Sequence, residues 1–390
     1  MSNKRTQGTI NRREFLGAGI AGTASLVLGG SALLNATPTD ASDFSFPKPV
    51  YRTHGRTGLN ITVVSFGAML TPESEVMRVA FDNGVNYVDT ARRYMGGKNE
   101  EIVGKAVKGI RNKLYIATKT QPASISASDI TKDIETSLKS LQTDYIDVIQ
   151  LHNLTSRERV YHAETREALM RAKQEGKVRY FGVTSHTNVA DVVNSVVDDK
   201  DRFFDTVLVA YNFKSGRDVH DAIQRAAAAG IGVIAMKTQQ GGYETSAMGQ
   251  VSHHQAALKW ALQNRNITAA IPGMKDMAQL REDIAVMGMP FTAADERVIR
   301  KYNAALDGYY CAFCGKCEGS CPLGIQISSI NRAMMYAEAY GSAELAVSTY
   351  REVSTAARAS ACNGCAECSA FCVNGVDIAA RMERARIFFS

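Results

Sequence analysis

Two cysteine runs constrain this chain more than any other feature of its sequence. Both have the spacing C-x2-C-x2-C-x3-C, and together they contain all eight cysteines of the 390 residues. The first run comprises Cys311, Cys314, Cys317 and Cys321, and the second comprises Cys362, Cys365, Cys368 and Cys372. Thiolates at every third position can bind three corners of an iron–sulfur cube. Zinc sites usually need only paired cysteines and disulfides need no duplicated spacing, so the pattern favours iron–sulfur clusters.

The spacing also predicts how two [4Fe–4S] clusters share these thiolates. When two such runs are paired, the fourth cysteine of each run tends to bind the cluster of the other run. One cluster would be bound by Cys311, Cys314, Cys317 and Cys372. The other would be bound by Cys362, Cys365, Cys368 and Cys321. Residues 325–340 and 343–359, between the runs, have helical patterns, which favours an α-helical ferredoxin-like module over residues 306–390. Phe313, Phe371 and Pro322 would shield the clusters.

Composition and charge exclude some functions. The 45% hydrophobic and 22% charged residues are typical of a globular protein. The formal net charge of +6 is modest and no basic run dominates, so no nucleic-acid partner is expected. Two oxidised clusters with four thiolates each would add about −4 and leave the loaded protein close to neutral. Beyond the N-terminal segment, no apolar run reaches the roughly 20 residues that a membrane-spanning helix needs.

Residues 1–45 differ from the rest of the chain. The sequence N-R-R-E-F-L at positions 11–16 precedes a weakly apolar stretch of small residues over positions 17–34. This resembles a twin-arginine export signal, and the alternatives are an N-terminal membrane anchor or a disordered basic tail. The resemblance implies a periplasmic or otherwise exported protein, which would be tethered to the membrane if the signal were not cleaved. Because this pathway moves folded proteins, the clusters would be inserted in the reducing cytoplasm.

From residue 51 to residue 282, short apolar segments alternate with amphipathic ones. The predicted strands are residues 62–66, 87–89, 114–118, 146–151, 180–183, 206–210, 232–236 and 269–271. The predicted helices include residues 73–83, 100–108, 128–141, 166–175, 218–229 and 254–264, followed by 291–303 and, at the end of the chain, 378–389. Eight buried strands with short polar turns favour parallel βα units and a closed (β/α)8 TIM barrel over residues 46–305. A doubly wound sheet is disfavoured because no G-x-G-x-x-G follows the first strand.

Four polar residues stand where a TIM barrel carries its chemistry, at the C-terminal ends of the strands. Asp89 ends the second predicted strand and Tyr94 follows five residues later. Lys119 closes the third strand, and His152 closes the fourth. Each of the four has a structural alternative, such as an Asp–Lys pair at the barrel rim, a surface tyrosine or a capping histidine. The combination favours a catalytic site.

The sequence around these four residues resembles the aldo-keto reductase superfamily. The resemblance rests on D-T-A-x-x-Y at 89–94, A-T-K at 117–119, D-Y-I-D at 144–147 leading to His152, I-P-G at 271–273, and the opening hairpin G-R-T-G-L at 55–59. It covers residues 50–305, about two thirds of the chain. The two-cluster tail is similar to that of an iron–sulfur branch of this superfamily. The resemblance implies an oxidoreductase that acts on a small carbonyl or alcohol substrate.

The four residues predict a division of roles in that reaction. Tyr94 would donate a proton to the carbonyl oxygen as a hydride reaches the carbon. Lys119, held by Asp89, would lower the pKa of this phenol from its reference value near 10. His152 would orient the carbonyl oxygen. In reverse, the same residues would oxidise an alcohol.

The resemblance also implies a site for NADP or NAD at the loops after the seventh and eighth strands. The implied residues are Gly273, Lys275, Gln279, Glu282 and Asp283, with Thr184 and Ser185 at the nicotinamide. A helix beginning near Asp276 would offer free N–H groups and its dipole to a phosphate, assisted by Lys275. Gln279 stands where many relatives carry an arginine for the 2′-phosphate. A neutral amide binds a phosphate more weakly than a guanidinium does, so this residue weakens the case for NADP over NAD.

Three further features of this region depart from the superfamily pattern or leave alternatives open. Ser185 replaces the usual asparagine, and Leu208 stands where a carboxamide-binding glutamine is expected. The loop at residues 236–242 offers a cation to the site, or is simply solvated.

We therefore expect an exported aldo-keto-reductase-like oxidoreductase that exchanges electrons with a redox partner protein or a membrane electron carrier. Clusters carry single electrons whereas nicotinamide carries a hydride, and no motif for a one-electron mediator is evident in the sequence. An alternative is an electron relay whose barrel is a non-catalytic docking scaffold. A third possibility is that the clusters are structural or redox-sensing beside ordinary reductase chemistry.

Overall fold

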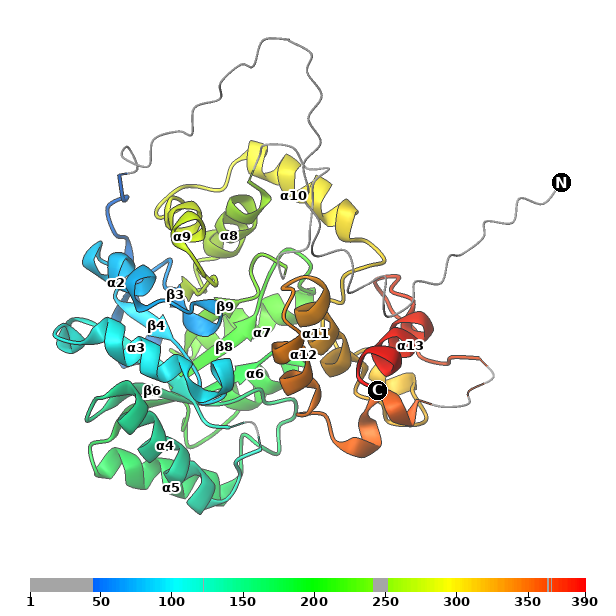
Figure 1. Cartoon of the computed structure of the whole chain (residues 1–390), viewed down its shortest axis with the longest axis horizontal. Coiled ribbons are helices and arrows are strands. Elements are labelled where there is room, and N and C mark those ends of the chain that lie inside the picture. Colours follow the sequence, from blue (N-terminus) through cyan, green and yellow to red (C-terminus); the bar gives the residue numbers. More distant parts are fainter. Residues whose placement is uncertain (1–44, 122, 241–251, 363–364, 366) are drawn as a thin grey trace, which may run out of the picture. The chain divides into compact units, whose positions relative to one another are not determined.

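The computed structural model describes residues 45–121, 123–240, 252–362, 365 and 367–390 (Figure 1). The described residues belong to one compact unit, Ser45–Ser390. The expected export signal, at residues 1–44, lies outside the described residues. None of the helices in the described ranges has the length and apolar content that crossing a membrane requires.

Eight parallel strands form the barrel that the sequence predicts. They are β3 (Phe66–Gly67), β4 (Tyr87–Asp89), β5 (Tyr115–Lys119), β6 (Ile146–Leu151), β7 (Val178–Ser185), β8 (Thr206–Ala210), β9 (Gly232–Met236) and β10 (Ala269–Ala270). Each strand pairs with the next one in chain order. The last strand returns to the first, because Ser65 N donates to Ala270 O at 2.9 Å and Gly67 N donates to Pro272 O at 3.0 Å. The (β/α)8 fold is confirmed.

The first predicted strand is wrong in its extent. Instead of one strand over residues 62–66, the structure has a hairpin of β1 (Tyr51–Thr53) and β2 (Asn60–Thr62), and β3 begins only at Phe66. The chain turns between β2 and β3, where Ser65 Oγ donates to Thr62 O at 2.6 Å. This hydrogen bond offers the backbone an alternative to a continuous strand.

Helices follow the strands and cover the outside of the barrel. They are α2 (Ser74–Asp82), α3 (Asn99–Val107), α4 (Ala127–Leu141), α5 (Ala163–Gln174), α6 (Val189–Val197), α7 (Arg217–Ala228), α8 (His253–Gln263) and α9 (Met277–Ile284). All six predicted helices of this region are present within a few residues. Several begin at a side chain that caps the first turn; Ser126 accepts from Asp129 N, for example. The prediction did not include α6, which is buried along much of its length.

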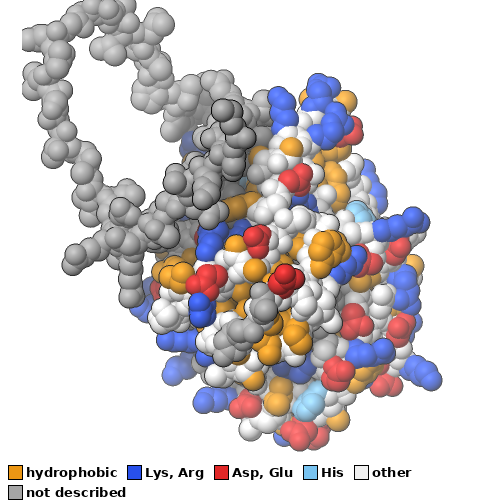
Figure 2. All heavy atoms as spheres, turned by 90° about the vertical axis from the view of Figure 1, so that its right-hand side faces the viewer, with side chains coloured by type: hydrophobic (Ala, Val, Ile, Leu, Met, Phe, Trp, Pro, Cys, Tyr) orange, Lys and Arg blue, Asp and Glu red, His pale blue; other side chains and the backbone are white. Residues whose placement is uncertain are grey.

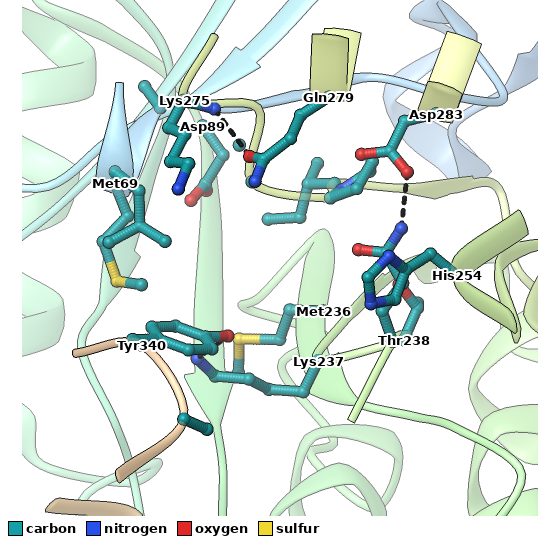
Figure 3. Close-up of a pocket in the computed structure, with 18 of the residues that line it drawn as sticks. Met69, Asp89, Met236, Lys237, Thr238, His254, Lys275, Gln279, Asp283 and Tyr340 are labelled. Atoms are coloured by element: carbon teal, nitrogen blue, oxygen red, sulfur yellow. Dashed lines mark hydrogen bonds between the residues drawn. The ribbon is translucent and has the colours of Figure 1, made fainter. Parts of the chain in front are cut away.

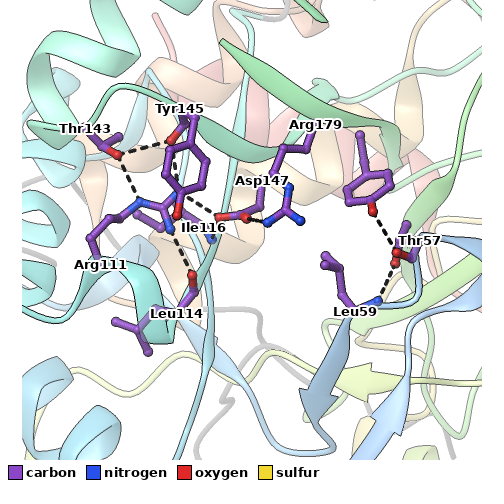
Figure 4. A network of polar contacts seen from close by, with 10 residues as sticks. Thr57, Leu59, Arg111, Leu114, Ile116, Thr143, Tyr145, Asp147 and Arg179 are labelled. Carbon is purple, nitrogen blue, oxygen red and sulfur yellow. Dashed lines mark hydrogen bonds and ion pairs between the residues drawn. The ribbon is translucent and has the colours of Figure 1, made fainter. Parts of the chain in front are cut away.

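The D-Y-I-D motif has a structural role at the N-terminal ends of the strands (Figure 4). Asp147, at the start of β6, is fully buried and accepts from Ile116 N of β5 at 2.9 Å. Arg111 Nη2 and Arg179 Nη1 donate to the same carboxylate at 2.8 and 2.9 Å. Asp147 therefore ties together β5, β6 and β7 on the side of the barrel opposite the predicted site.

The C-terminal module is helical, as predicted. Its helices are α11 (Ile327–Glu338), α12 (Ala343–Tyr350) and α13 (Ile378–Phe388), and α10 (Ala293–Leu306) precedes it. The predicted helix 343–359 is too long, since α12 ends at Tyr350. Arg358 donates to Val353 O at 2.9 Å and to Arg351 O at 3.2 Å, which satisfies carbonyl groups that a longer helix would have bonded.

The module contacts the C-terminal ends of the barrel strands. Asn153, after β6, donates to Glu352 of the module at 2.9 Å, and Lys237, after β9, donates to Tyr340 OH at 3.2 Å. The face that carries α13 exposes apolar side chains among charged ones (Figure 2). Phe313 is buried, as expected of a residue that shields a cluster. Phe371 is 72% exposed and Pro322 is also exposed, so their expected shielding role is not supported.

Candidate active site

The four residues predicted to be catalytic converge at the C-terminal ends of β4, β5 and β6. Lys119 Nζ pairs with the Asp89 carboxylate and also donates to Thr90 O at 2.7 Å. The same Nζ lies 4.7 Å from the centre of the Tyr94 ring. The rings of Tyr94 and His152 meet edge to face, with their centroids 6.0 Å apart. A carboxylate, an ammonium, a phenol and an imidazole thus lie within one site.

The local sequence explains how Tyr94 reaches this position. It begins the short 3-10 helix η3 (Tyr94–Gly97), inside which Met95 has a positive φ of 52°. Asn99, at the start of α3, accepts from Thr90 Oγ1 at 2.7 Å and donates to Ala68 O at 2.8 Å. These buried bonds hold the loop that carries Tyr94 against the barrel rim.

Burial dominates the electrostatics of the site. It raises the pKa of Tyr94, although the Lys119 ammonium acts in the opposite direction. Our expectation of a lowered phenol pKa is therefore wrong in its net direction, because desolvation outweighs the neighbouring charge. Burial, assisted by Lys119, lowers the pKa of His152 well below its usual range. Tyr94 and His152 are thus both neutral near pH 7, and both can donate a hydrogen bond to a carbonyl oxygen.

Lys119 itself stays charged. Burial favours the neutral amine, but the nearby Asp89 and Tyr94 outweigh that cost and raise the pKa of Lys119. Gln150 Nε2 donates to the other Asp89 oxygen at 2.8 Å, so the carboxylate is held on both sides. The ion pair is thereby fixed next to the phenol.

A cavity of about 290 Å³ opens beside these residues (Figure 3). Asp89 and Tyr94 line it. Five of the seven predicted nucleotide residues also line it, namely Gly273, Lys275, Gln279, Glu282 and Asp283. The structure thus brings the predicted phosphate and adenosine region to the same cavity as the predicted proton donor.

The start of α9 faces the cavity, but two of the N–H groups that were expected to hold a phosphate there already have protein partners. Asp276 caps this helix by accepting from Gln279 N at 2.9 Å, and Gln279 Oε1 accepts from Lys275 N at 3.0 Å. Gly273 leaves room for close approach, because an added Cβ would meet only the Leu70 side chain, at 3.7 Å. Burial raises the pKa of Asp283 to about 7.

Thr184 and Ser185 do not fit the nicotinamide end as predicted. Both lie buried at the end of β7, and neither lines the cavity. Thr184 Oγ1 accepts from Asn153 N at 2.8 Å, and Ser185 Oγ donates to Thr187 O at 2.7 Å. The next residue, His186, lines the cavity instead. Within the described part of the chain, its Nδ1 has no hydrogen-bond partner.

The C-terminal module supplies another part of the cavity wall. Tyr336 of α11 and Tyr340 just beyond this helix both line the cavity. Lys237 Nζ lies 4.4 Å from the centre of the Tyr336 ring and 4.8 Å from that of Tyr340. Sequence reasoning missed these residues, because nothing local to α11 indicates which barrel surface it covers. His186, by contrast, could have been found by the rule that located Lys119.

The cysteines gather in two groups that agree with the crossed arrangement, and their assignment to two clusters stays a prediction. All eight are free of disulfides. The neighbours of Cys311 are Cys317, Cys314 and Cys372, and those of Cys362 are Cys321, Cys368 and Cys365. Among the described residues, no three metal-binding side chains lie close enough to share a single ion. A four-iron cluster spreads its thiolates more widely than one ion does, so the two groups fit cluster binding better than a mononuclear site.

Comparisons with known proteins divide the chain in the same way. Residues 71–250 match the Aldo/keto reductase family, and residues 310–377 match the 4Fe-4S dicluster domain. An L-galactose dehydrogenase of Arabidopsis thaliana is 28% identical over 302 residues, which cover 66% of this chain and 94% of that protein. A methylglyoxal reductase of Escherichia coli is 24% identical over 249 residues, covering 60% of this chain and 86% of the reductase.

Solved structures resemble the barrel. The holo form of the aldo-keto reductase AKR11C1 from Bacillus halodurans has a TM-score of 0.55 at 25% identity, covering 65% of this chain and 96% of that one. An aldo-keto reductase from Klebsiella pneumoniae in complex with NADPH also has a TM-score of 0.55, at 23% identity, covering 65% of this chain and 95% of that one.

Proposed function

We propose that this chain, an oxidoreductase of the aldo-keto reductase type that also carries a 4Fe-4S dicluster domain, reduces a small carbonyl compound or oxidises the corresponding alcohol at Tyr94. The observation that supports this most strongly is the convergence of Tyr94, Lys119, Asp89 and His152 beside one cavity. The relatives named as dehydrogenase and reductase support the same reaction type.

The side chains of this site would transfer the proton and hold the carbonyl oxygen in place. A nicotinamide nucleotide, when bound, supplies or accepts the hydride. Tyr94 gives its proton to the carbonyl oxygen during reduction and takes it back during alcohol oxidation. Neutral His152 donates a hydrogen bond that holds this oxygen, and Lys119 stabilises the phenolate that Tyr94 leaves behind. The carbonyl thus gains a hydride at carbon and a proton at oxygen.

The nucleotide part of this proposal rests on α9 and its loop. Gly273, Lys275 and Gln279 present an open backbone, a cation and an amide to the cavity, which suits NADP or NAD. The NADPH named with the Klebsiella reductase supports the same class of cofactor.

The proposal also includes two [4Fe–4S] clusters and export. The crossed neighbours of the eight cysteines support two clusters, which would pass single electrons to a redox partner protein or a membrane electron carrier. The N-R-R-E-F-L sequence at positions 11–16 supports export by the twin-arginine pathway to the periplasm. Anaerobic purification from the periplasmic fraction, with iron and acid-labile sulfide measured per chain, tests both parts.

Replacing Tyr94 by Phe tests the chemistry. We expect kcat/KM for carbonyl reduction to fall by a factor of about 10² to 10⁴, because the proton donor is lost. Tyr51→Phe is the matched control, since Tyr51 is exposed and its hydroxyl bonds only to Gly84 O in the described structure, away from the cavity. Iron content and melting temperature should stay unchanged in both variants. Equal turnover by the Tyr94→Phe variant would contradict the proposal.

One observation favours the alternative of an electron relay with a non-catalytic barrel. The Thr184 and Ser185 hydroxyls are already bonded to backbone groups, and Leu208 stands where a carboxamide-binding side chain is expected. A protein that binds neither NAD nor NADP, but whose clusters still accept and release electrons, would support the relay instead.

A further inference from the structure

Three cations, Arg93, Arg332 and Lys237, lie around Tyr336 where the C-terminal module meets the barrel, and Lys237 among them lines the cavity. Arg93, after β4, and Arg332 of α11 both pair with the single carboxylate of Glu352, Arg332 at 2.8 Å. Lys237 has no carboxylate partner among the described residues, and its contacts there are the phenols of Tyr336 and Tyr340. Three cations thus face one carboxylate.

All three cations are largely shielded from water. The side chains of Arg93 and Arg332 are only 13% and 4% exposed. Lys237 lies between the module tyrosines and the barrel, in the wall of the cavity. A buried charge without a counter-charge is unfavourable, so this cluster favours an additional anion, which could reach it at Lys237.

The neighbouring groups that the structure describes do not supply that anion. Asp89 is already paired with Lys119. Burial keeps His152 and His186 neutral by lowering both pKa values well below the usual range. Burial favours the neutral phenol of Tyr336, but Lys237 and Arg332 outweigh it and lower the pKa. Ionisation of that phenol would offset one of the two surplus charges and leave the other.

The position of Lys237 separates it from the nucleotide residues. Figure 3 shows Lys237 and Tyr340 on one side of the cavity, and Lys275, Gln279 and Asp283 on the opposite side. Tyr336, which contacts Lys237, also lies within electrostatic range of Tyr94. An anion at Lys237 would therefore lie next to Tyr336, on the side of the cavity opposite the predicted phosphate end.

We propose that Lys237, together with Tyr336 and Tyr340, binds a carboxylate group of the substrate whose carbonyl or hydroxyl group meets Tyr94. This inference rests on the proposed function and narrows its substrate class to oxo or hydroxy compounds that carry an acid group. The ammonium of Lys237 supplies the charge, and the two phenols add hydrogen bonds.

Calorimetric titration with two probes of nearly equal shape tests this site. The probes are 4-carboxybenzaldehyde and its methyl ester, titrated into the anaerobically purified holoprotein with and without NADP⁺. NADP⁺ has no hydride to deliver, so binding is measured without turnover. We expect the carboxylate to bind at least about tenfold more tightly than the ester, as a charge-assisted bond predicts.

Substitutions at Lys237 identify the group responsible. Lys237→Met should abolish the preference for the carboxylate while ester binding is retained, and Lys237→Arg should keep the preference. Lys214→Met is the control, because Lys214 pairs with Asp307 and does not line the cavity. Melting temperature and iron content verify folding. If Lys237→Met does not fold, Lys237→Gln takes its place.

Several outcomes would overturn the inference. Equal binding of the two probes by the wild type, or no binding of either, would do so. A Lys237→Met variant that keeps the carboxylate preference would also contradict it. If this variant instead weakened NADP⁺ binding as Lys275→Met does, the anion at Lys237 would be a nucleotide phosphate. A protein that prefers the carboxylate probe yet reduces no carbonyl would retain this site and lose only the proposed function.

Discussion

Lys119 Nζ lies 4.7 Å from the centre of the Tyr94 ring, yet its charge is already engaged by Asp89. The ammonium therefore stabilises a phenolate only in part, and burial keeps the phenol protonated. This balance between burial and the Lys119 charge suits a proton donor, because the phenol must keep its proton until the carbonyl oxygen accepts it.

The raised pKa of Tyr94 determines how the rate depends on pH. Carbonyl reduction needs the protonated phenol, so its kcat/KM should stay level through neutral pH and decrease only above about pH 10, the reference value for tyrosine. Alcohol oxidation needs the phenolate, so its kcat/KM should increase with pH across the same range. Lys119→Met should move both changes to still higher pH, since it removes the charge that opposes burial. A reduction rate that fell near pH 7 would contradict this assignment.

Gln279 should control the choice between NADP and NAD. It lines the cavity beside Lys275, and its amide carries no charge. Gln279→Arg should tighten NADPH binding by about tenfold and leave NADH binding nearly unchanged, because a guanidinium can pair with a 2′-phosphate. Gln174→Arg, on an exposed part of α5, adds the same charge elsewhere and serves as the control. Equal changes for both nucleotides would place the 2′-phosphate away from Gln279.

The crossed cysteine arrangement predicts which variants share a phenotype. Cys372→Ser should affect the same cluster as Cys311→Ser, and Cys321→Ser the same cluster as Cys362→Ser. With two four-iron clusters, each variant should lose about four of about eight irons. Electron paramagnetic resonance of the reduced proteins should show one residual spectrum for the first pair and another for the second. If Cys372→Ser matched Cys362→Ser, each run would bind its own cluster.

Asp147 should contribute strongly to stability although it lies far from the chemistry. Asp147→Ala removes the buried acceptor of Arg111, Arg179 and Ile116 N. We expect the free energy of unfolding to fall by about 3 kcal/mol, because Arg111 loses its buried partner. Asp82→Ala, which breaks an exposed pair with Arg78, should cost under about 1 kcal/mol. Anaerobic urea unfolding measures both, and similar losses in the two variants would contradict a special role for Asp147.

The sequence predicted those parts of the site that depend on local order. Asp89, Lys119 and His152 each close a strand, and strands of a barrel bring such positions to one rim, so their convergence follows from the fold. His186 also directly follows a strand, β7. It was not predicted, because Ser185 before it departs from the superfamily pattern.

Other features depend on packing between segments distant in sequence. The roles of Tyr336 and Lys237 arise only because α11 lies against the loop after β9, which no periodicity reveals. The direction of the Tyr94 pKa shift was also beyond the sequence, because it depends on how completely the phenol is buried.

The placement of Tyr336 and Tyr340 has an evolutionary consequence. These two tyrosines belong to the segment that separates the cysteine runs, so the part of the chain that matches the 4Fe-4S dicluster domain also forms part of the cavity beside Tyr94. Grafting a foreign tail onto this barrel would therefore replace part of the cavity wall. If the proposed function holds, changes selected for electron transfer in this segment would also change the cavity that the substrate enters.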